Sequence, residues 1–292
     1  MPSYSSSSLT RIPITTFKTP HTTRLATNTQ VKIVSAPISW PEKLAPPSSV
    51  SGLVIGTTEP GAKVFVDGRS VRVSAGGVFL IGFGRDAKAA LSLRIVHPDG
   101  SATDKSLSVA RRDYPEQRID GLPDRQVTPS PEDLKRIKAD NAKIAKVRVR
   151  DSDRADFTSG FAWPARGPVS SVFGSRRILN GKPRRPHNGV DVAAPRGSTI
   201  AAAADGVVAL THPDMFFTGK TVMIDHGHGL SSVYVHMDDI LVADGQRVKK
   251  GTPIGIVGKT GRVTGPHLHW GVSLFGTHLD PALLAAPMEG VR

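Results

Sequence analysis

Short runs of alternating apolar and polar residues fill the stretch between residues 50 and 110. The runs are Val50–Thr58, Ala62–Val66, Ser70–Val78, Ala90–Val96 and Ser106–Ala110. Turn-forming pairs and triplets separate them, at Pro60-Gly61, Asp67-Gly68, Gly76-Gly77 and Pro98-Asp99-Gly100. Several short strands joined by such turns are typical of a small antiparallel β-sandwich. We therefore predict a β-sandwich domain over residues 49–112, and we find no catalytic cluster in it.

A similar pattern returns after residue 160, now rich in glycine and in histidine. Its apolar runs are Val169–Phe173, Gly189–Val192, Gly206–Leu210, Thr221–Ile224, Ser231–His236, Pro253–Val257 and Leu268–Leu274. Turns are frequent, and no amphipathic helix of useful length interrupts the runs. We predict a second, all-β domain over residues 161–292, so the expected fold class is mainly β, with antiparallel sheets.

A helix is predicted between the two β-rich parts. Ser130 is a favourable N-cap, Pro131 suits the first helical position, and two acidic residues follow in the first turn. Apolar residues then recur at roughly helical spacing, at Leu134, Ile137, Ile144 and Val147. We predict a helix over about residues 131–149, within a linker that spans residues 113–160.

The start of the chain has the composition of a disordered leader, which we assign to residues 1–48. Residues 1–41 are rich in Ser and Thr, and no acidic residue precedes Glu42. They lack the apolar segment of a secretory signal peptide, so no signal peptide is evident. No part of the chain approaches the run of about 18 apolar residues that a membrane helix needs, and we expect no transmembrane segment.

The formal net charge of +13 implies an anionic partner. The Lys and Arg residues are scattered, and aromatic residues make up only 5% of the chain, which argues against nucleic acid. A basic surface suited to an anionic cell wall, or one that is simply solvated, fits the pattern better. The chain has no cysteine, so a bound metal would be held by histidine and carboxylate ligands.

One candidate metal-binding segment is His187-Asn188-Gly189-Val190-Asp191. Side chains alternate along a strand, so His187, Gly189 and Asp191 are expected on one face. A histidine and a carboxylate placed in this way can converge on one ion. Gly189 between them has no side chain to fill the space that the ion needs.

A second candidate segment runs from Gly265 to Val272 and contains His267-Leu268-His269. The two histidines are expected on one face of a strand, with apolar residues on the other. Together the two segments supply enough imidazoles and one carboxylate for the three-ligand set of a catalytic zinc site, with one histidine to spare. The spacing does not decide which histidine of the pair binds the metal.

A third segment of interest is Val233-Tyr234-Val235-His236. Strand alternation predicts that Val233 and Val235 face the core, while Tyr234 and His236 share the opposite face. We assign the remaining histidines of this domain to turns. They are His212, His226, His228 and His278.

With these residues assembled, the C-terminal part of the chain closely resembles the lysostaphin-type zinc endopeptidases. Four motifs carry the resemblance in order over about 100 residues: Ser171–Arg176, His187–Asp191, Tyr234–His236 and Gly261–His269. The β-rich stretch and the helix before them are also similar to the N-terminal region of bacterial envelope members of that family.

The resemblance implies a role for each of five residues. His187, Asp191 and His269 would bind one Zn²⁺ per chain, and His236 and His267 would be the catalytic histidines. Zinc can lower the pKa of bound water to about 7, a neutral imidazole can accept its proton, and an imidazolium can stabilise an oxyanion. The resemblance does not say which of the two histidines acts as the base.

The resemblance also implies a substrate and a place of action. The chain would hydrolyse peptide bonds of peptidoglycan in the periplasm or cell envelope, and secretion would also fit. D-alanyl cross-links are favoured over glycine bridges, because the N-terminal region is of the envelope type.

Two alternatives belong to other functional classes. A catalytically inactive wall-binding or amidase-activating protein would bind no zinc and hydrolyse nothing. A carrier domain of the barrel-sandwich type is suggested by Gly245–Gly251, but that segment lacks a modifiable lysine at a tight turn and leaves the histidines unexplained.

Overall fold

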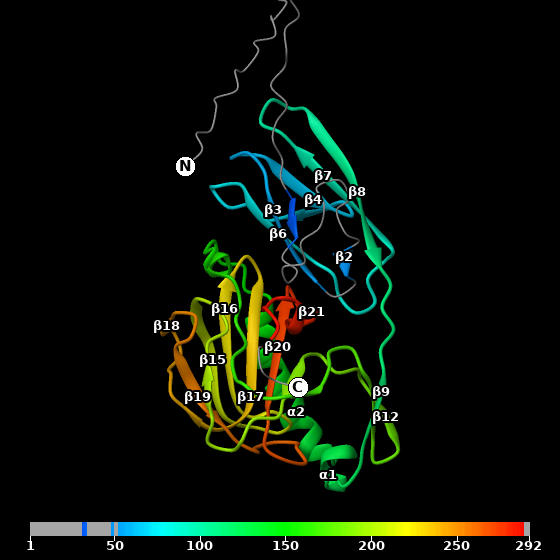
Figure 1. Cartoon of the computed structure of the whole chain (residues 1–292), viewed down its shortest axis with the longest axis vertical. Coiled ribbons are helices and arrows are strands. Elements are labelled where there is room, and N and C mark those ends of the chain that lie inside the picture. Colours follow the sequence, from blue (N-terminus) through cyan, green and yellow to red (C-terminus); the bar gives the residue numbers. More distant parts are fainter. Residues whose placement is uncertain (1–30, 34–47, 50–51, 289–292) are drawn as a thin grey trace, which may run out of the picture.

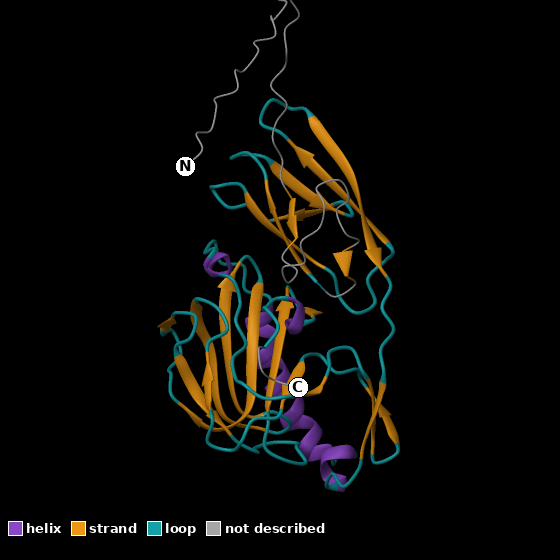
Figure 2. Cartoon of the chain, in the orientation of Figure 1, coloured by secondary structure: helices purple, strands orange, loops and turns teal. Residues whose placement is uncertain are grey.

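The computed structural model describes residues 31–33, 48–49 and 52–288. Two β-rich bodies are stacked along the long axis of the molecule (Figure 1). The first ends near residue 110, and the second begins at residue 116 and carries the two α-helices (Figure 2). Most of the expected leader lies outside the described residues, although Val31–Ile33 forms strand β1.

The first body is a sandwich of two sheets. One sheet has the order β1-β3-β6, with β3 at Leu53–Thr57 and β6 at Val78–Gly82. The other has the order β2-β8-β7-β4-β5, and its strands are β2 (Ser48–Ser49), β4 (Lys63–Val66), β5 (Arg69–Val71), β7 (Ala90–Val96) and β8 (Ala102–Ala110). Val54, Phe79 and Ile95 are among the side chains buried between the sheets. The predicted mainly β fold with an N-terminal β-sandwich is confirmed.

The sheet of β3 and β6 is buried on both of its faces. Because side chains alternate along a strand, Val54 points into the sandwich core while Leu53 points the other way. Leu53 and Leu80 belong to the same buried cluster as Leu274 in the second body. A Cβ atom on Gly82 would lie 3.1 Å from a methyl carbon of Leu274, so the two bodies are in close contact.

The segment that joins the two bodies contributes structure to the second body. Strand β9 (Glu116–Ile119) pairs in parallel with β11 (Arg176–Leu179), which also pairs with β12 (Lys182–Arg184). The short helix α1 (Asp124–Val127) follows β9. Part of the chain that the sequence indicated only as a spacer therefore forms an edge of the second body.

The helix expected at about 131–149 spans Pro131–Arg148 and is labelled α2. Its start is fixed by a capping box, in which Ser130 and Asp133 each bond the other's backbone N–H, and by proline in the first turn. Its buried residues Ile144 and Val147 pack in a cluster with Val233 and Val235. Within the described part of the chain, no helix has the length and apolar character needed to cross a membrane.

The second body is built on an antiparallel sheet with the strand order β10-β13-β20-β17-β16-β15-β18, to which β14, β19 and β21 add further pairings. The strands are β10 (Val169–Ser171), β13 (Val190–Val192), β14 (Thr199–Ala201), β15 (Gly206–Met215), β16 (Gly219–Gly227), β17 (Leu230–Ile240), β18 (Arg247–Val248), β19 (Pro253–Val257), β20 (Leu268–Leu274) and β21 (Thr277–Leu279). Two short 3₁₀ turns, Asp156–Ser159 and Pro281–Leu283, complete it. Val192, Tyr234, Leu268 and Trp270 lie in the core on one side of this sheet. The other side carries α2 and the polar residues described below.

These contacts change the expectation for an isolated C-terminal fragment. From the motifs alone, residues 161–292 should retain the metal and some activity. Fragment 161–292 lacks β9 and α2, so Val233 and Val235 lose the helix that covers them and β11 loses a neighbour. We expect it to melt at a lower temperature and to bind zinc more weakly than fragment 114–292. Thermal melts and metal content of the two purified fragments measure this, and equal values would contradict the expectation.

Candidate metal centre and its cleft

Strand pairing brings the candidate ligands together. In the register between β13 and β20, Asp191 lies directly opposite His269. His187 precedes β13, and its backbone N–H and C=O bond to Ser175 and Gly174 of the preceding loop. Residues 82 positions apart in the sequence are thereby held at one point of the sheet.

Three ligand atoms form a compact triangle. Nε2 of His187 lies 3.0 Å from Oδ1 of Asp191 and 2.9 Å from Nδ1 of His269. The same Asp191 oxygen is 2.8 Å from Nδ1 of His269. Among the residues that the structure describes, His187, Asp191 and His269 form the group of side chains that could hold a metal ion. Two imidazole nitrogens with one carboxylate oxygen are a donor set that zinc prefers.

The hydrogen bonds of His187 support the presence of a cation. Its Nδ1 lies 3.1 Å from the carbonyl oxygen of Val172, which can only accept, so Nδ1 carries the proton. The lone pair on Nε2 then faces a carboxylate oxygen at 3.0 Å. Two acceptors in this arrangement repel each other unless a cation lies between them.

The protonation states suit metal binding as well. Burial lowers the pKa of His187 to about 4, although Asp191 favours the charged form, so this imidazole is neutral at pH 7. Burial opposes ionisation of Asp191, but the contacts of its carboxylate with His187 and His269 outweigh it and hold the pKa of Asp191 well below its usual value. Both groups are thus in the state that a metal ligand requires.

Gly189 leaves the space that the ligands need. A Cβ atom at this position would lie 2.4 Å from the carbonyl oxygen of Trp270 and 2.8 Å from the ring of His269. No side chain fits there without moving β20 or the His269 imidazole. The glycine is thus required by the close approach of β20 and the His269 ring, where the sequence suggested space for the ion itself. The donor set of His187, Asp191 and His269 fits a bound zinc ion.

A second layer of side chains holds the ligands in place. Nη2 of Arg177 donates to Oδ2 of Asp191 at 2.8 Å and to Oγ of Ser171 at 3.1 Å. Oγ of Ser171 lies 2.9 Å from Nδ1 of His187 and 2.7 Å from Oε1 of Gln117. Arg177 and Gln117 follow no recognisable pattern in the sequence, because their contacts depend on the packing of β9 and β11 beside the candidate ligands.

His236 and His267 lie next to this triangle. Their ring centroids are 4.8 Å apart, and the His236 ring is 6.4 Å from that of His269. Nδ1 of His236 donates to the carbonyl of Thr260 at 2.8 Å, and Nδ1 of His267 donates to that of Gly265 at 2.9 Å. Nδ1 of each ring is therefore committed to the backbone, which leaves Nε2 for other partners. Burial, together with the neighbouring His267 and His269, lowers the pKa of His236 well below its usual value.

The expected alternation around His236 is wrong. Tyr234 pairs with Trp270 and points into the main core, where its hydroxyl bonds the backbone of Ala203. Strict alternation would place His236 beside it. Instead the strand register shifts here and His236 adopts a φ of 66°, a left-handed conformation that costs a non-glycine residue roughly 1–3 kcal/mol. The irregular backbone lets the His236 ring lie beside those of His267 and His269.

The other histidines of this body lie apart from the metal centre. His226 belongs to β16 and not to a turn, and its fully buried ring bonds Asp205 O at 2.6 Å and Ser232 Oγ at 2.7 Å. His212 and His278 also lie in strands, β15 and β21, so these turn assignments were wrong. His228 does lie in the turn between β16 and β17, with a positive φ.

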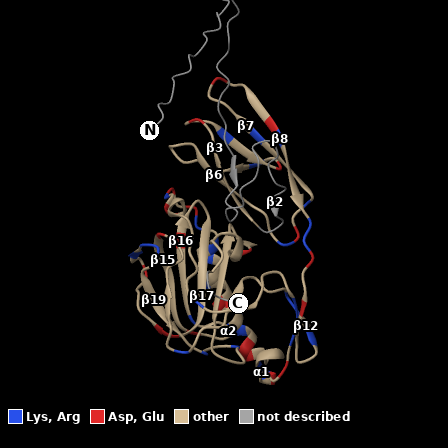
Figure 3. Cartoon of the chain, in the orientation of Figure 1, with Lys and Arg blue, Asp and Glu red and all other residues tan. Residues whose placement is uncertain are grey.

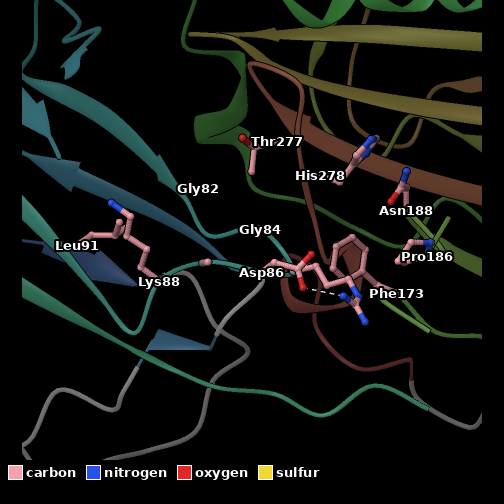
Figure 4. Close-up of a pocket in the computed structure, with 12 residues that line it drawn as sticks. Gly82, Gly84, Asp86, Lys88, Leu91, Phe173, Pro186, Asn188, Thr277 and His278 are labelled. Carbon is pink, nitrogen blue, oxygen red and sulfur yellow. Dashed lines mark hydrogen bonds and ion pairs between the residues drawn. The ribbon is translucent and has the colours of Figure 1, made fainter. Parts of the chain in front are cut away.

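A cleft of about 200 Å³ opens above the metal centre. Its lining includes His236, Arg262 and His267, together with Gln117, Ile119 and Leu122 from the joining segment. A larger hollow of about 500 Å³ lies between the two bodies, near Lys88, Asn188 and His278 (Figure 4). That hollow holds no cluster of metal ligands among the described residues, so the smaller cleft is the candidate active site.

A candidate metal centre with an adjacent pair of histidines, set in a cleft of a β-sheet, is the type of site found in metallopeptidases. The profile described as "Peptidase family M23" matches residues 185–281. A solved structure of a putative peptidase M23 from Pseudomonas aeruginosa is 31% identical, has a TM-score of 0.64, and aligns over 84% of this chain and 97% of that chain. The chain belongs to peptidase family M23, which confirms the family expected from the motifs.

Curated relatives match over a shorter region. Peptidoglycan DD-endopeptidase ShyA of Vibrio cholerae is 42% identical over 123 residues, which cover 41% of this chain and 28% of that protein. The DD-carboxypeptidase/endopeptidase Mpg of Neisseria meningitidis is 40% identical over 119 residues, which cover 41% and 27%. The chain thus matches a little over a quarter of the length of these relatives.

We predict that Gly189→Ala will impair the metal centre. The new methyl group would push against the backbone of β20 and the His269 ring, so zinc content and thermal stability should both fall. Gly76→Ala is the matched control, because Gly76 has a negative φ and a Cβ there would meet only one atom, at 3.9 Å. Normal zinc binding by Gly189→Ala would disprove this account of the glycine.

Proposed function

We propose that this chain is a zinc-dependent endopeptidase that hydrolyses peptide bonds in peptidoglycan, acting in the periplasm or cell envelope. The observation that carries the proposal is the convergence of His187, Asp191 and His269 with His236 and His267 in one open cleft. Membership of family M23 supports peptidase activity. The names of ShyA and Mpg support peptidoglycan as the substrate class.

His187, Asp191 and His269 would hold the zinc ion, with Arg177 and Ser171 keeping two of the ligands oriented. When bound, zinc supplies a Lewis acid that polarises a carbonyl group and makes water more acidic. The protein restricts each ligand to one orientation, which is the usual task of groups that bond metal ligands. The donor set and the bonds of His187 are the structural support for this assignment.

His236 and His267 would carry out proton transfer and charge stabilisation. Each has its Nδ1 proton committed to a backbone carbonyl, so each offers Nε2 as a base. Once protonated, the same nitrogen can donate to a developing oxyanion. His236 is buried and strongly favours the neutral form, which suits it to accept a proton.

Among peptidoglycan bonds, we propose that D-alanyl cross-links are cleaved in preference to glycine bridges. The names of the curated relatives refer to DD-endopeptidase activity. Nucleic acid is not a proposed partner, since Lys and Arg are spread over both bodies with acidic residues among them (Figure 3). An inactive wall-binding role remains the alternative against which the experiments are designed.

Digestion of purified peptidoglycan tests the function directly. We expect soluble peptide products from sacculi with D-alanyl cross-links, loss of activity with a chelator, and recovery when zinc is added back. Mass analysis of the products identifies the bond. Cleavage of glycine bridges alone would reverse the proposed preference. If zinc-loaded protein hydrolyses neither the D-alanyl cross-linked nor the glycine-bridged peptidoglycan, an inactive wall-binding role would be favoured.

Substitutions in the cleft should separate ligands from catalytic groups. Asp191→Ala and His269→Ala should lose both zinc and activity, because each removes one of three protein ligands. His236→Ala should keep zinc while hydrolysis falls by about 10²–10⁴-fold, the usual range for general acid–base help. Metal analysis and turnover of the same preparations provide the two measurements.

His267 and His269, at the start of β20, provide the strictest test of the division between metal ligands and catalytic groups. Nδ1 of His269 lies 2.8 Å from Asp191, while Nε2 of His267 is 3.9 Å from the same oxygen. His267→Ala should therefore retain zinc. If His267→Ala loses zinc and His269→Ala keeps it, the two assignments must be exchanged, and full activity of His236→Ala would disprove the two-histidine mechanism.

A further inference from the structure

Arg262 places a guanidinium group in the cleft beside the candidate metal ligands. It lies on the loop that precedes His267 and lines the same 200 Å³ space as Asp191, His236 and His267. Its side chain is half-buried. A guanidinium group is therefore present beside the metal centre, where a substrate peptide must lie.

The guanidinium of Arg262 has no ion pair with any residue in the described ranges. Its carbon atom lies 4.2 Å from the centre of the Phe217 ring, and Nη1 makes one long hydrogen bond, 3.3 Å, to the carbonyl of Gln126. Gln126 in turn donates to the carbonyl of Gly261 at 3.2 Å. These contacts restrain the side chain without neutralising its charge.

The surroundings of Arg262 are positively charged. Arg177 is paired with Asp191, the candidate metal ligand, and Arg184 donates only to the backbone carbonyls of Val127 and Pro183. Burial lowers the pKa of Arg262 to about 10, and the charges of Arg177 and Arg184 act in the same direction. The cation still persists at pH 7, but it is disfavoured, and an anionic group in the cleft would compensate it.

We infer that Arg262 binds a carboxylate of the substrate next to the scissile bond. This rests on the proposed function. In a D-alanyl cross-link to a diamino diacid, D-alanine supplies the carbonyl of the scissile bond and the diamino diacid supplies its nitrogen. The carbon that bears this nitrogen also carries a free carboxylate. A glycine bridge has no such group. A guanidinium binds a carboxylate through two parallel N–H donors, which gives orientation as well as affinity.

Arg262 as a carboxylate-binding group and Arg262 as a purely structural group should give different results when the residue is replaced. If the Arg262 guanidinium only joins α1 to Phe217, its replacement should weaken the binding of every substrate alike or lower the stability of the protein. A carboxylate-binding guanidinium discriminates between two substrates that differ in one group. The ratio between such substrates is therefore the informative quantity.

The experiment compares two D-alanyl-diaminopimelate cross-linked peptides, one with this carboxylate free and one with it amidated. Binding is measured by calorimetry to zinc-loaded full-length His236→Ala, and kcat and KM are measured with the otherwise unaltered chain. We expect the free carboxylate to be favoured by about 10–100-fold, the effect of a hydrogen bond to a charged group. Arg262→Gln should reduce that ratio to near one, and Arg262→Lys should retain part of it.

Arg184→Gln is the matched control. It removes a guanidinium that donates only to backbone carbonyls, so the ratio between the two peptides should persist. Zinc content and melting temperature of each variant show whether the fold is intact. If Arg262→Gln does not fold, Arg262→Lys carries the comparison, and its unaltered ratio would overturn the inference.

The outcomes separate this inference from the proposed function. If the unaltered chain cleaves both peptides equally, the inference is wrong and the function stands. If neither peptide is cleaved but the free carboxylate binds better through Arg262, the inference stands and the hydrolytic function fails. If Arg262→Gln keeps the full preference, another group recognises the carboxylate and the inference is wrong.

Discussion

The pairing of β13 with β20 places Asp191 directly opposite His269, and the metal centre depends on that register. A shift by one residue would turn each side chain to the other face of the sheet, and Trp270 would then exchange places with a ligand. The buried apolar face of β20 resists such a shift, because Leu268, Trp270 and Val272 occupy the main core. Core packing and ligand geometry are therefore fixed by the same strand.

The support for the ligands comes from a part of the chain well before the region that matches the family profile. Gln117 bonds Ser171, and Ser171 contacts both His187 and Arg177. Leu122 and Ile119 line the cleft on the same side. The joining segment therefore lines part of the candidate active site, although it precedes the region that carries the family motifs.

Burial and charge act together in the cleft. Burial keeps His187 and His236 neutral, so a ring nitrogen of each remains free to accept a metal ion or a proton. The same burial makes an uncompensated guanidinium costly, which gives Arg262 a strong tendency to bind an anion. A divalent cation held through two imidazoles and one carboxylate would retain positive charge for a substrate carboxylate.

Local sequence patterns determined the strands, the start of α2 and the candidate ligands. Alternating apolar runs identify strands, a Ser-Pro cap identifies a helix start, and the motifs around His187 and His269 contain the metal donors within a few residues. Tertiary structure decided which donors converge, because the register of β13, β20 and β17 is set by contacts between distant residues. It also decided the position of His236, which depends on a left-handed backbone that alternation cannot predict. The contributions of Gln117 and Arg177 arise only when separate segments pack together, and the environment of Arg262, although it lies within the Gly261–His269 motif, is decided in the same way.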